Sequence, residues 1–363
     1  MLYAVRALGD GVLLYPVYAL LFADAGLTTG QISTLFVIWS VVSFAFEVPS
    51  GALADAWSRR GLYTIGQILI GAGYALWLVW PAFPGFALGF VLWGIGGALT
   101  SGTLEALVYD QVGDDYAKVI GRAGTVGILA MTAATLLAAP AFAVGGYRLV
   151  GIASVAVVTL SGLLALGLPD SRGTGGEGPG YAALLRSGLR ESVKSRRIVL
   201  ALAVAALLPG FSALDEYLPL LAREKGAPTV AVPLIYALTA LAMAAGSALA
   251  GRFAARPILG CSVAGAAALL AAGVLIPHLA GMVVISAAFG LLQFAMVRGE
   301  TRLQDEITGP ARTTVLSVSG FGAEVFAVLL YAWFALPLAL TPLFALAAIP
   351  LLLTAVLEIV RRG

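Results

Sequence analysis

Several carboxylates interrupt the apolar stretches of this sequence, and they are the residues best suited to chemistry. The chain is 60% hydrophobic and only 11% charged. A charged group at the centre of a membrane span costs about 2.5–3.5 kcal/mol, so each one needs a function or a partner. A carboxylate that alternates between a wet and a closed apolar environment can take up and release a proton. The candidates for a proton-coupling or cavity site are Asp10, Arg6, Glu47, Glu105, Asp215, Glu216 and Glu324.

Plainer interpretations of the same charges stay open. Arg6 and Asp10 are spaced i, i+4 and could simply neutralise each other. Asp215 and Glu216 lie among prolines and could be solvated in a vestibule at the outer end of their span. Glu105 could join a charged cluster at the cytoplasmic end of the protein instead of contacting a substrate.

Aromatic residues near these charges could form a stacking surface for a lipophilic ligand. The candidates for substrate contact are Tyr15, Tyr18, Trp39, Trp93 and Tyr217. Carboxylates in an apolar cavity also attract cationic amphiphiles. The alternative is that these rings only pack the helices or anchor them at the membrane interface.

The elements that position these residues must be membrane-spanning helices. A mean hydropathy of +0.98 over 363 residues is far outside the range of water-soluble domains. Apolar stretches of about 20 residues recur through the chain, and alternating ten-residue strands of a membrane barrel are absent from the sequence. The backbone must satisfy its own hydrogen bonds in lipid, so the expected fold is all-α.

Composition also excludes several function classes. The net charge of +2 and the scattered basic residues argue against binding of nucleic acid. A single cysteine, Cys261, and a single histidine, His278, leave no disulfide framework, no soft-ligand metal site and no Ser/His/Asp catalytic set. The G-x-x-x-x-G-K-[ST] loop of a primary pump is missing as well. We therefore expect neither an enzyme nor a bound cofactor or metal.

Hydropathy predicts twelve spans in two halves. Residues 1–168 form the predicted N-terminal six-helix half, 169–197 a cytoplasmic linker with a short amphipathic helix over 181–194, and 198–363 the C-terminal six-helix half. The predicted spans are 2–22, 31–54, 62–80, 84–108, 122–144, 147–168, 198–222, 228–252, 257–278, 281–300, 311–334 and 338–360.

The basic residues predict the orientation of these spans. If the N-terminus is cytoplasmic, all but four of the 21 lysines and arginines lie in cytoplasmic loops or at the C-terminus. The exceptions are Arg6, inside the first span, and Arg148, Arg223 and Lys225 on the outer side. This asymmetry satisfies the positive-inside rule, so both termini are expected in the cytoplasm.

A weak internal repeat supports the division into halves. GALADAWSRR at 51–60 aligns with SALAGRFAAR at 247–256, and GRAGTV at 121–126 aligns more weakly with ARTTVL at 311–316. Parallel halves related by a pseudo-two-fold axis along the membrane normal are typical of transporters, with the substrate site between the halves near the bilayer midplane.

The segment GALADAWSRRGL at 51–62 resembles the loop motif G-x-L-A-D-x-x-G-R-R-x-L of the major facilitator superfamily, with Ala56 and Ser58 as departures. FEVPSG at 46–51, SGTLEALVYD at 101–110 and GYRL at 146–149 are similar to a bacterial, efflux-like branch. The resemblance implies a cavity lined by the first, fourth, seventh and tenth helices. It also implies a cytoplasmic latch, whose charges pair in one conformation and separate in another. The latch candidates are Gly51, Asp55, Arg59, Arg60, Asp110 and Arg122.

Two motifs of proton-coupled drug exporters are absent from the sequence. The fourth span, FALGFVLWGIGGALTSG, has no central arginine, and the fifth, which contains LLAAPAFAVGG, lacks the G-x-x-x-G-P-x-x-G-G signature. The resemblance therefore implies the fold and transport more directly than it implies antiport.

These features together predict a secondary transporter that works by alternating access. We expect proton-coupled export of small amphiphilic compounds or drugs by a monomer in the bacterial inner membrane, with the substrate, protons and the lipid bilayer as its partners. One alternative is a proton-coupled uptake symporter for a small solute. Another is a membrane receptor that keeps the fold without transport.

Overall fold

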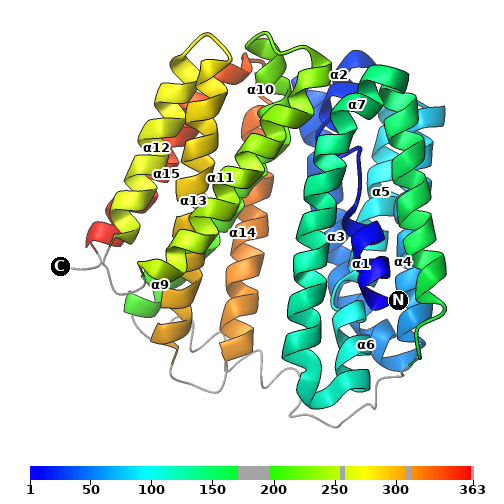
Figure 1. Ribbon diagram of the computed structural model, residues 1–363. Coiled ribbons are helices and arrows are strands. Elements are labelled where there is room, and N and C mark those ends of the chain that lie inside the picture. Colours follow the sequence, from blue (N-terminus) through cyan, green and yellow to red (C-terminus); the bar gives the residue numbers. More distant parts are fainter. Residues whose placement is uncertain (171–195, 254–257, 308–311, 361–363) are drawn as a thin grey trace. The chain divides into compact units, whose positions relative to one another are not determined.

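The structure is a computed structural model that describes residues 1–170, 196–253, 258–307 and 312–360, in which helices and no strands occur (Figure 1). The chain divides into two compact units. Unit 1 comprises Met1–Gly176 and Thr229–Leu234, and unit 2 comprises Glu177–Pro228 and Ile235–Gly363. The predicted linker at 169–197 lies almost wholly outside the described residues, and so does its amphipathic helix at 181–194.

Unit 1 is a bundle in which α1 packs on α7, α4 packs on α5 and α7, and α3 packs on α5. Its helices are α1 (Leu2–Asp10), α2 (Tyr18–Asp24), α3 (Thr29–Ala56), α4 (Arg59–Val79), α5 (Phe83–Thr100), α6 (Thr103–Val112), the 3₁₀ turn η1 (Gly113–Asp115) and α7 (Tyr116–Ala165). Glycines bring α4 and α5 together, because a Cβ added at Gly66 would lie 2.7 Å from the carbonyl oxygen of Gly96. Such small residues allow close approach of helices in membranes.

Unit 2 is a second bundle, in which α12 packs on α13 and α15, and α9 packs on α13 and α14. Its elements are α9 (Arg196–Gly210), η2 (Phe211–Tyr217), α10 (Leu218–Glu224), α11 (Val232–Arg252), α12 (Leu259–Leu275), α13 (Ala280–Glu306), α14 (Arg312–Phe334) and α15 (Leu340–Val360). The 3₁₀ turn η3 (Thr229–Ala231) and the first residues of α11 group with unit 1.

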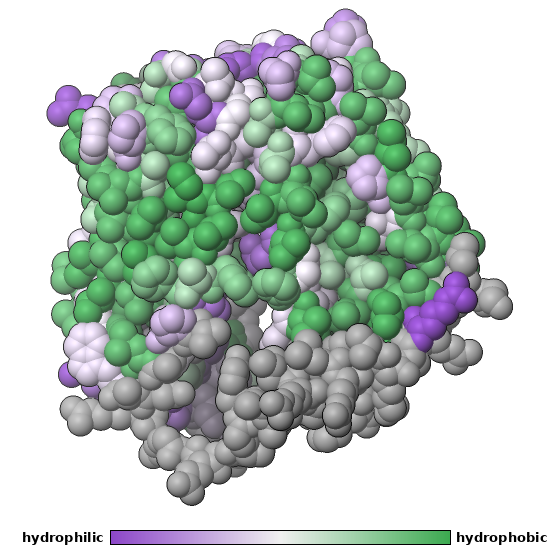
Figure 2. Space-filling view, turned by 180° about the vertical axis from the view of Figure 1, so that it is seen from behind, coloured by the Kyte–Doolittle hydropathy of each residue, from purple (hydrophilic) through white to green (hydrophobic). Residues whose placement is uncertain are grey.

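The helices have the length and composition of membrane spans. Within the described residues, nine helical stretches are long and apolar enough to cross a bilayer. One of them, α7, has 50 residues and turns at Gly146 (φ 55°, ψ −153°), so it is long enough for two spans. With α12 and the pair α1 and α2, this is consistent with twelve spans. Apolar side chains cover the middle of the face in Figure 2, and hydrophilic ones gather along its upper edge.

The first predicted span, 2–22, is not a continuous helix. It is interrupted over 11–17, between α1 and α2. Pro16 lies in the interruption, where its ring removes a backbone donor and clashes with a helical geometry. The backbone N–H of Leu14 instead donates to the buried hydroxyl of Ser154 at 3.0 Å.

The seventh predicted span, 198–222, is interrupted at the corresponding place. Its central segment, Phe211–Tyr217, is a 3₁₀ helix that lies 200 residues after the first interruption. The correspondence extends to the ends of the helices that follow, because Gly26 and Gly226 both have a φ of 91°. The two halves therefore share a structural repeat that sequence identity barely shows.

Adjacent charges at the end of α10 tie two other helices of unit 2 together. The Glu224 carboxylate accepts hydrogen bonds from the backbone N–H groups of Leu340 and Thr341, both at 3.2 Å, at the N-terminus of α15. The Lys225 ammonium donates to the carbonyl oxygen of Val274 at 2.8 Å, at the C-terminus of α12. Both charges have the sign that favours their helix end. Burial lowers the pKa of Lys225, and the neighbouring Glu224 carboxylate opposes that shift.

Candidate functional site

The charged residues of α1 meet a carboxylate from α6 inside unit 1. Arg6 Nε lies 2.7 Å from Asp10 Oδ2, and Arg6 Nη1 lies 3.6 Å from Glu105 Oε1. Each of the three side chains keeps about a third of its surface exposed. The cluster thus places two carboxylates around one guanidinium, at the point where α1 ends and the unwound segment begins.

A glycine of α7 makes room for this cluster. A Cβ added at Gly127 would lie 3.1 Å from Arg6 Nε and closer still to the Asp10 carboxylate. Any side chain at position 127 would therefore push against the ion pair. Sequence reasoning missed Gly127, because nothing in a glycine-rich span marks the residue that faces a charge on another helix.

Polar residues of α4 and α7 hold α1 in place. The Ser161 hydroxyl donates to the carbonyl oxygen of Val5 at 2.7 Å, and it lies 3.2 Å from the Tyr63 hydroxyl. Gln67 is buried one turn beyond Tyr63, and its Oε1 has no hydrogen-bond partner among the described residues. A buried polar layer of this kind fixes the position of α1, and with it the position of the cluster.

An aromatic cluster lies along the same unit. Trp93 is at its centre, with ring centroids 5.8 Å from Tyr15 and 5.4 Å from Trp39. Tyr15, Trp39 and Trp93 are half-buried, whereas Tyr18 is buried among other rings. Three of the predicted contact residues therefore keep a surface that a ligand could reach.

Unit 2 holds the second set of predicted carboxylates. Asp215 and Glu216 lie side by side in the 3₁₀ segment η2, both half-buried, and the Tyr236 side chain of α11 hydrogen-bonds Asp215. Tyr217 is fully buried, with its ring stacked 4.2 Å from that of Phe334. Glu324 lies on an exposed position of α14. Unit 2 thus presents an acidic pair at its interrupted helix, whereas the interrupted helix of unit 1 carries Arg6 and Asp10 and its second carboxylate, Glu105, comes from α6.

Two arginines at the start of α4 form contacts within unit 1. Arg59 is buried and pairs with Asp110, and its Nη1 also donates to the carbonyl oxygen of Ala106 at 3.2 Å. Arg60 donates to the carbonyl oxygen of Leu166 at 3.1 Å and lies 3.8 Å from Asp170. These contacts join α4 to α6 and to the end of α7.

The other predicted latch and cavity residues have different surroundings. Gly51 and Arg122 are exposed, and Arg122 forms no ion pair with any residue that the structure describes. The side chain of Asp55 lies outside the described part of the chain. Glu47 is exposed and accepts a hydrogen bond from the Ser101 hydroxyl at 2.9 Å.

A buried ion pair in unit 2 was not predicted. Glu358 of α15 is fully buried and pairs with Arg302 of α13. Sequence reasoning used Arg302 only to orient the spans. The two residues are 56 positions apart, and no local pattern shows that they meet.

Comparison with known proteins decides the family. Residues 1–299 match the Major Facilitator Superfamily. The chain belongs to this superfamily. It is therefore a multi-pass membrane protein of a transporter family.

Relatives and structures agree with this assignment. An uncharacterized MFS-type transporter of Methanocaldococcus jannaschii is 30% identical over 116 residues, which is 31% of this chain and 27% of that protein. The nucleoside transporter NupG has a TM-score of 0.78 at 12% identity, covering 100% of this chain and 97% of NupG. The POT family transporter PepTSo has a TM-score of 0.75 at 12% identity, covering 99% and 96%. At these identities the structures show a shared fold, and the substrates of those proteins are not assigned to this chain.

Proposed function

We propose that this superfamily member is a secondary transporter that works by alternating access and exports small amphiphilic compounds in exchange for protons. The observation that carries the proposal is the cluster of Arg6, Asp10 and Glu105 in unit 1. With all three groups ionised, the cluster has a net charge of −1. One proton on either carboxylate makes it neutral.

A cationic substrate can neutralise the same cluster. Because uncompensated charge is costly among apolar helices, the cluster favours either one proton or one substrate cation, but not both. This competition is the physical requirement for antiport. Tyr15 follows Asp10 in the unwound segment and stacks with Trp93, so the apolar part of such a substrate has aromatic surface to contact.

The proposal includes an orientation. Both termini face the cytoplasm of a bacterial cell, and the contact between Arg59 and Asp110 is a latch at the cytoplasmic end. The excess of basic residues in the loops on that side supports this orientation. The proposed transporter is a monomer, because a single chain contains both halves of the transporter fold.

Reconstituted vesicles test the proposal. Protein is incorporated into liposomes that enclose a pH-sensitive dye, an inside-acid gradient is imposed, and lipophilic cations and neutral amphiphiles are added. We expect substrate-triggered proton efflux for the wild type and for Asp115→Asn, an exposed aspartate in the turn before α7. Asp10→Asn should abolish it.

The other outcomes each contradict part of the proposal. Proton movement in the same direction as the substrate would establish symport instead. Binding of a compound without any transport would favour a receptor. Equal loss in Asp115→Asn would show that the assay reports damage to the protein rather than coupling at Asp10.

A further inference from the structure

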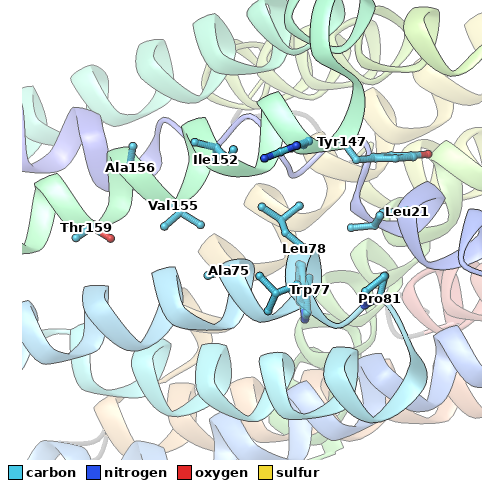
Figure 3. A pocket seen from close by; sticks show the side chains of 12 residues that line it. Leu21, Ala75, Trp77, Leu78, Pro81, Tyr147, Ile152, Val155, Ala156 and Thr159 are labelled. Atoms are coloured by element: carbon cyan, nitrogen blue, oxygen red, sulfur yellow. The ribbon is translucent and has the colours of Figure 1, made fainter.

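A groove opens between α4 and the second half of α7 in unit 1. It encloses about 860 Å³ and is lined mainly by apolar residues. Figure 3 shows Val155 and Leu78 projecting into the space between the two helices, and Ala75 and Ala156 also line the groove. The small alanine side chains leave the space open, and a volume of this size can hold a ligand of drug size or larger.

The groove has the length of one membrane leaflet. Its lining on α7 runs from Tyr147 to Thr159, which is about 18 Å at 1.5 Å per residue. Half the hydrocarbon thickness of a bilayer is about 15 Å. An acyl chain that enters from the lipid side would therefore lie along the whole groove.

One end of the groove lies where a lipid headgroup is expected. Gly146 turns the chain there, and Trp80 is exposed at the end of α4, as interfacial tryptophans are. The groove also includes Arg148, which is exposed and forms no ion pair with any described residue. The carboxylate of Asp24 is bonded instead to the Tyr147 hydroxyl, at 2.5 Å.

We infer that this groove is a binding site for an anionic phospholipid, with an acyl chain between α4 and α7 and the phosphate of the headgroup against Arg148. The charge of Arg148 selects an anionic headgroup over a zwitterionic one, as basic pockets between membrane helices do. The inference is independent of the proposed antiport and of its charged cluster.

Native mass spectrometry with a lipid mixture tests this site. Purified protein in a neutral detergent is incubated with equal amounts of phosphatidylglycerol and phosphatidylcholine that carry identical acyl chains, and retained lipids are identified by mass. We expect the wild type to retain one phosphatidylglycerol with about a fivefold preference, which corresponds to about 1 kcal/mol for one basic residue. Arg148→Gln should lose the preference. Arg252→Gln, an exposed arginine of unit 2, should keep it.

A second pair of variants tests the apolar part. Ala156→Trp fills the groove and should reduce retention of both lipids, whereas Leu160→Trp, an exposed position on the same helix outside the groove, should not. Equal retention of the two lipids by the wild type would overturn the role of the headgroup. Wild-type behaviour of both Arg148→Gln and Ala156→Trp would overturn the site.

Discussion

The buried ion pair of unit 2 predicts unequal losses of stability for its two partners. Glu358 is fully buried, whereas the Arg302 side chain keeps 30% of its surface exposed. Arg302→Met leaves a buried carboxylate without its guanidinium, and removal of one partner from a buried pair costs about 3–5 kcal/mol. Glu358→Gln leaves a guanidinium that water can still reach, so we expect a smaller loss, about 1–3 kcal/mol.

Stability is measured by thermal unfolding in detergent, with size-exclusion chromatography as the readout. Because membrane proteins often unfold irreversibly, the order of the midpoints is compared rather than a free energy. We expect Arg302→Met to melt below Glu358→Gln. The double variant Arg302→Met/Glu358→Leu should lose less than the two single losses combined, since both charges of the pair are removed together. Additive losses, or a lower midpoint for Glu358→Gln, would refute this reasoning.

Three further predictions concern other contacts. Gly127→Val should abolish substrate-dependent proton movement in vesicles, because the new side chain displaces the ion pair of Arg6 and Asp10 that faces it. Gly124→Val, which has open space around its Cβ, should not. Equal effects of the two variants would contradict a role for the space at position 127. Ser154→Ala should melt at a lower temperature than the wild type, because it leaves the backbone N–H of Leu14 unsatisfied at a cost of about 1–3 kcal/mol. An unchanged midpoint would show that another acceptor replaces the Ser154 hydroxyl. Burial lowers the pKa of Lys225 in the folded protein below its ordinary 10.5. Between the folded and unfolded pKa values the unfolded chain binds more protons, so the stability of the fold should rise with pH there. The melting midpoint of Lys225→Met should depend less on pH than that of the wild type, and equal slopes would contradict the lowered pKa.

The sequence predicted the fold well because membrane helices follow from composition. Length and hydropathy are enough to predict an all-helical membrane fold, and the segment at 51–62 is enough for the superfamily. The interruptions over 11–17 and 211–217 were not predicted. A single proline in an apolar run does not distinguish a kink from an unwound segment. One contact that stabilises the unwound segment comes from another helix, where the Ser154 hydroxyl accepts the backbone N–H of Leu14.

The sequence predicted contacts within one helix of the site, but not the contacts between helices. Asp10 and Arg6 are neighbours on one helix, so their contact follows from their spacing. The approach of Glu105 to Arg6 depends on how α6 and α1 are placed in the bundle. The same holds for Gly127, whose importance comes from the absence of a side chain. Both the approach of Glu105 and the need for space at Gly127 depend on tertiary packing, and local sequence shows neither.

The central claim is that a proton and a cationic substrate compete for the cluster around Arg6. The most direct test is proton release from the purified protein in a weakly buffered solution as a lipophilic cation is added, with binding measured in parallel by fluorescence. The account predicts release of close to one proton per bound cation in the wild type, and no release in Asp10→Asn/Glu105→Gln. Binding of the cation to the wild type without proton release would contradict it.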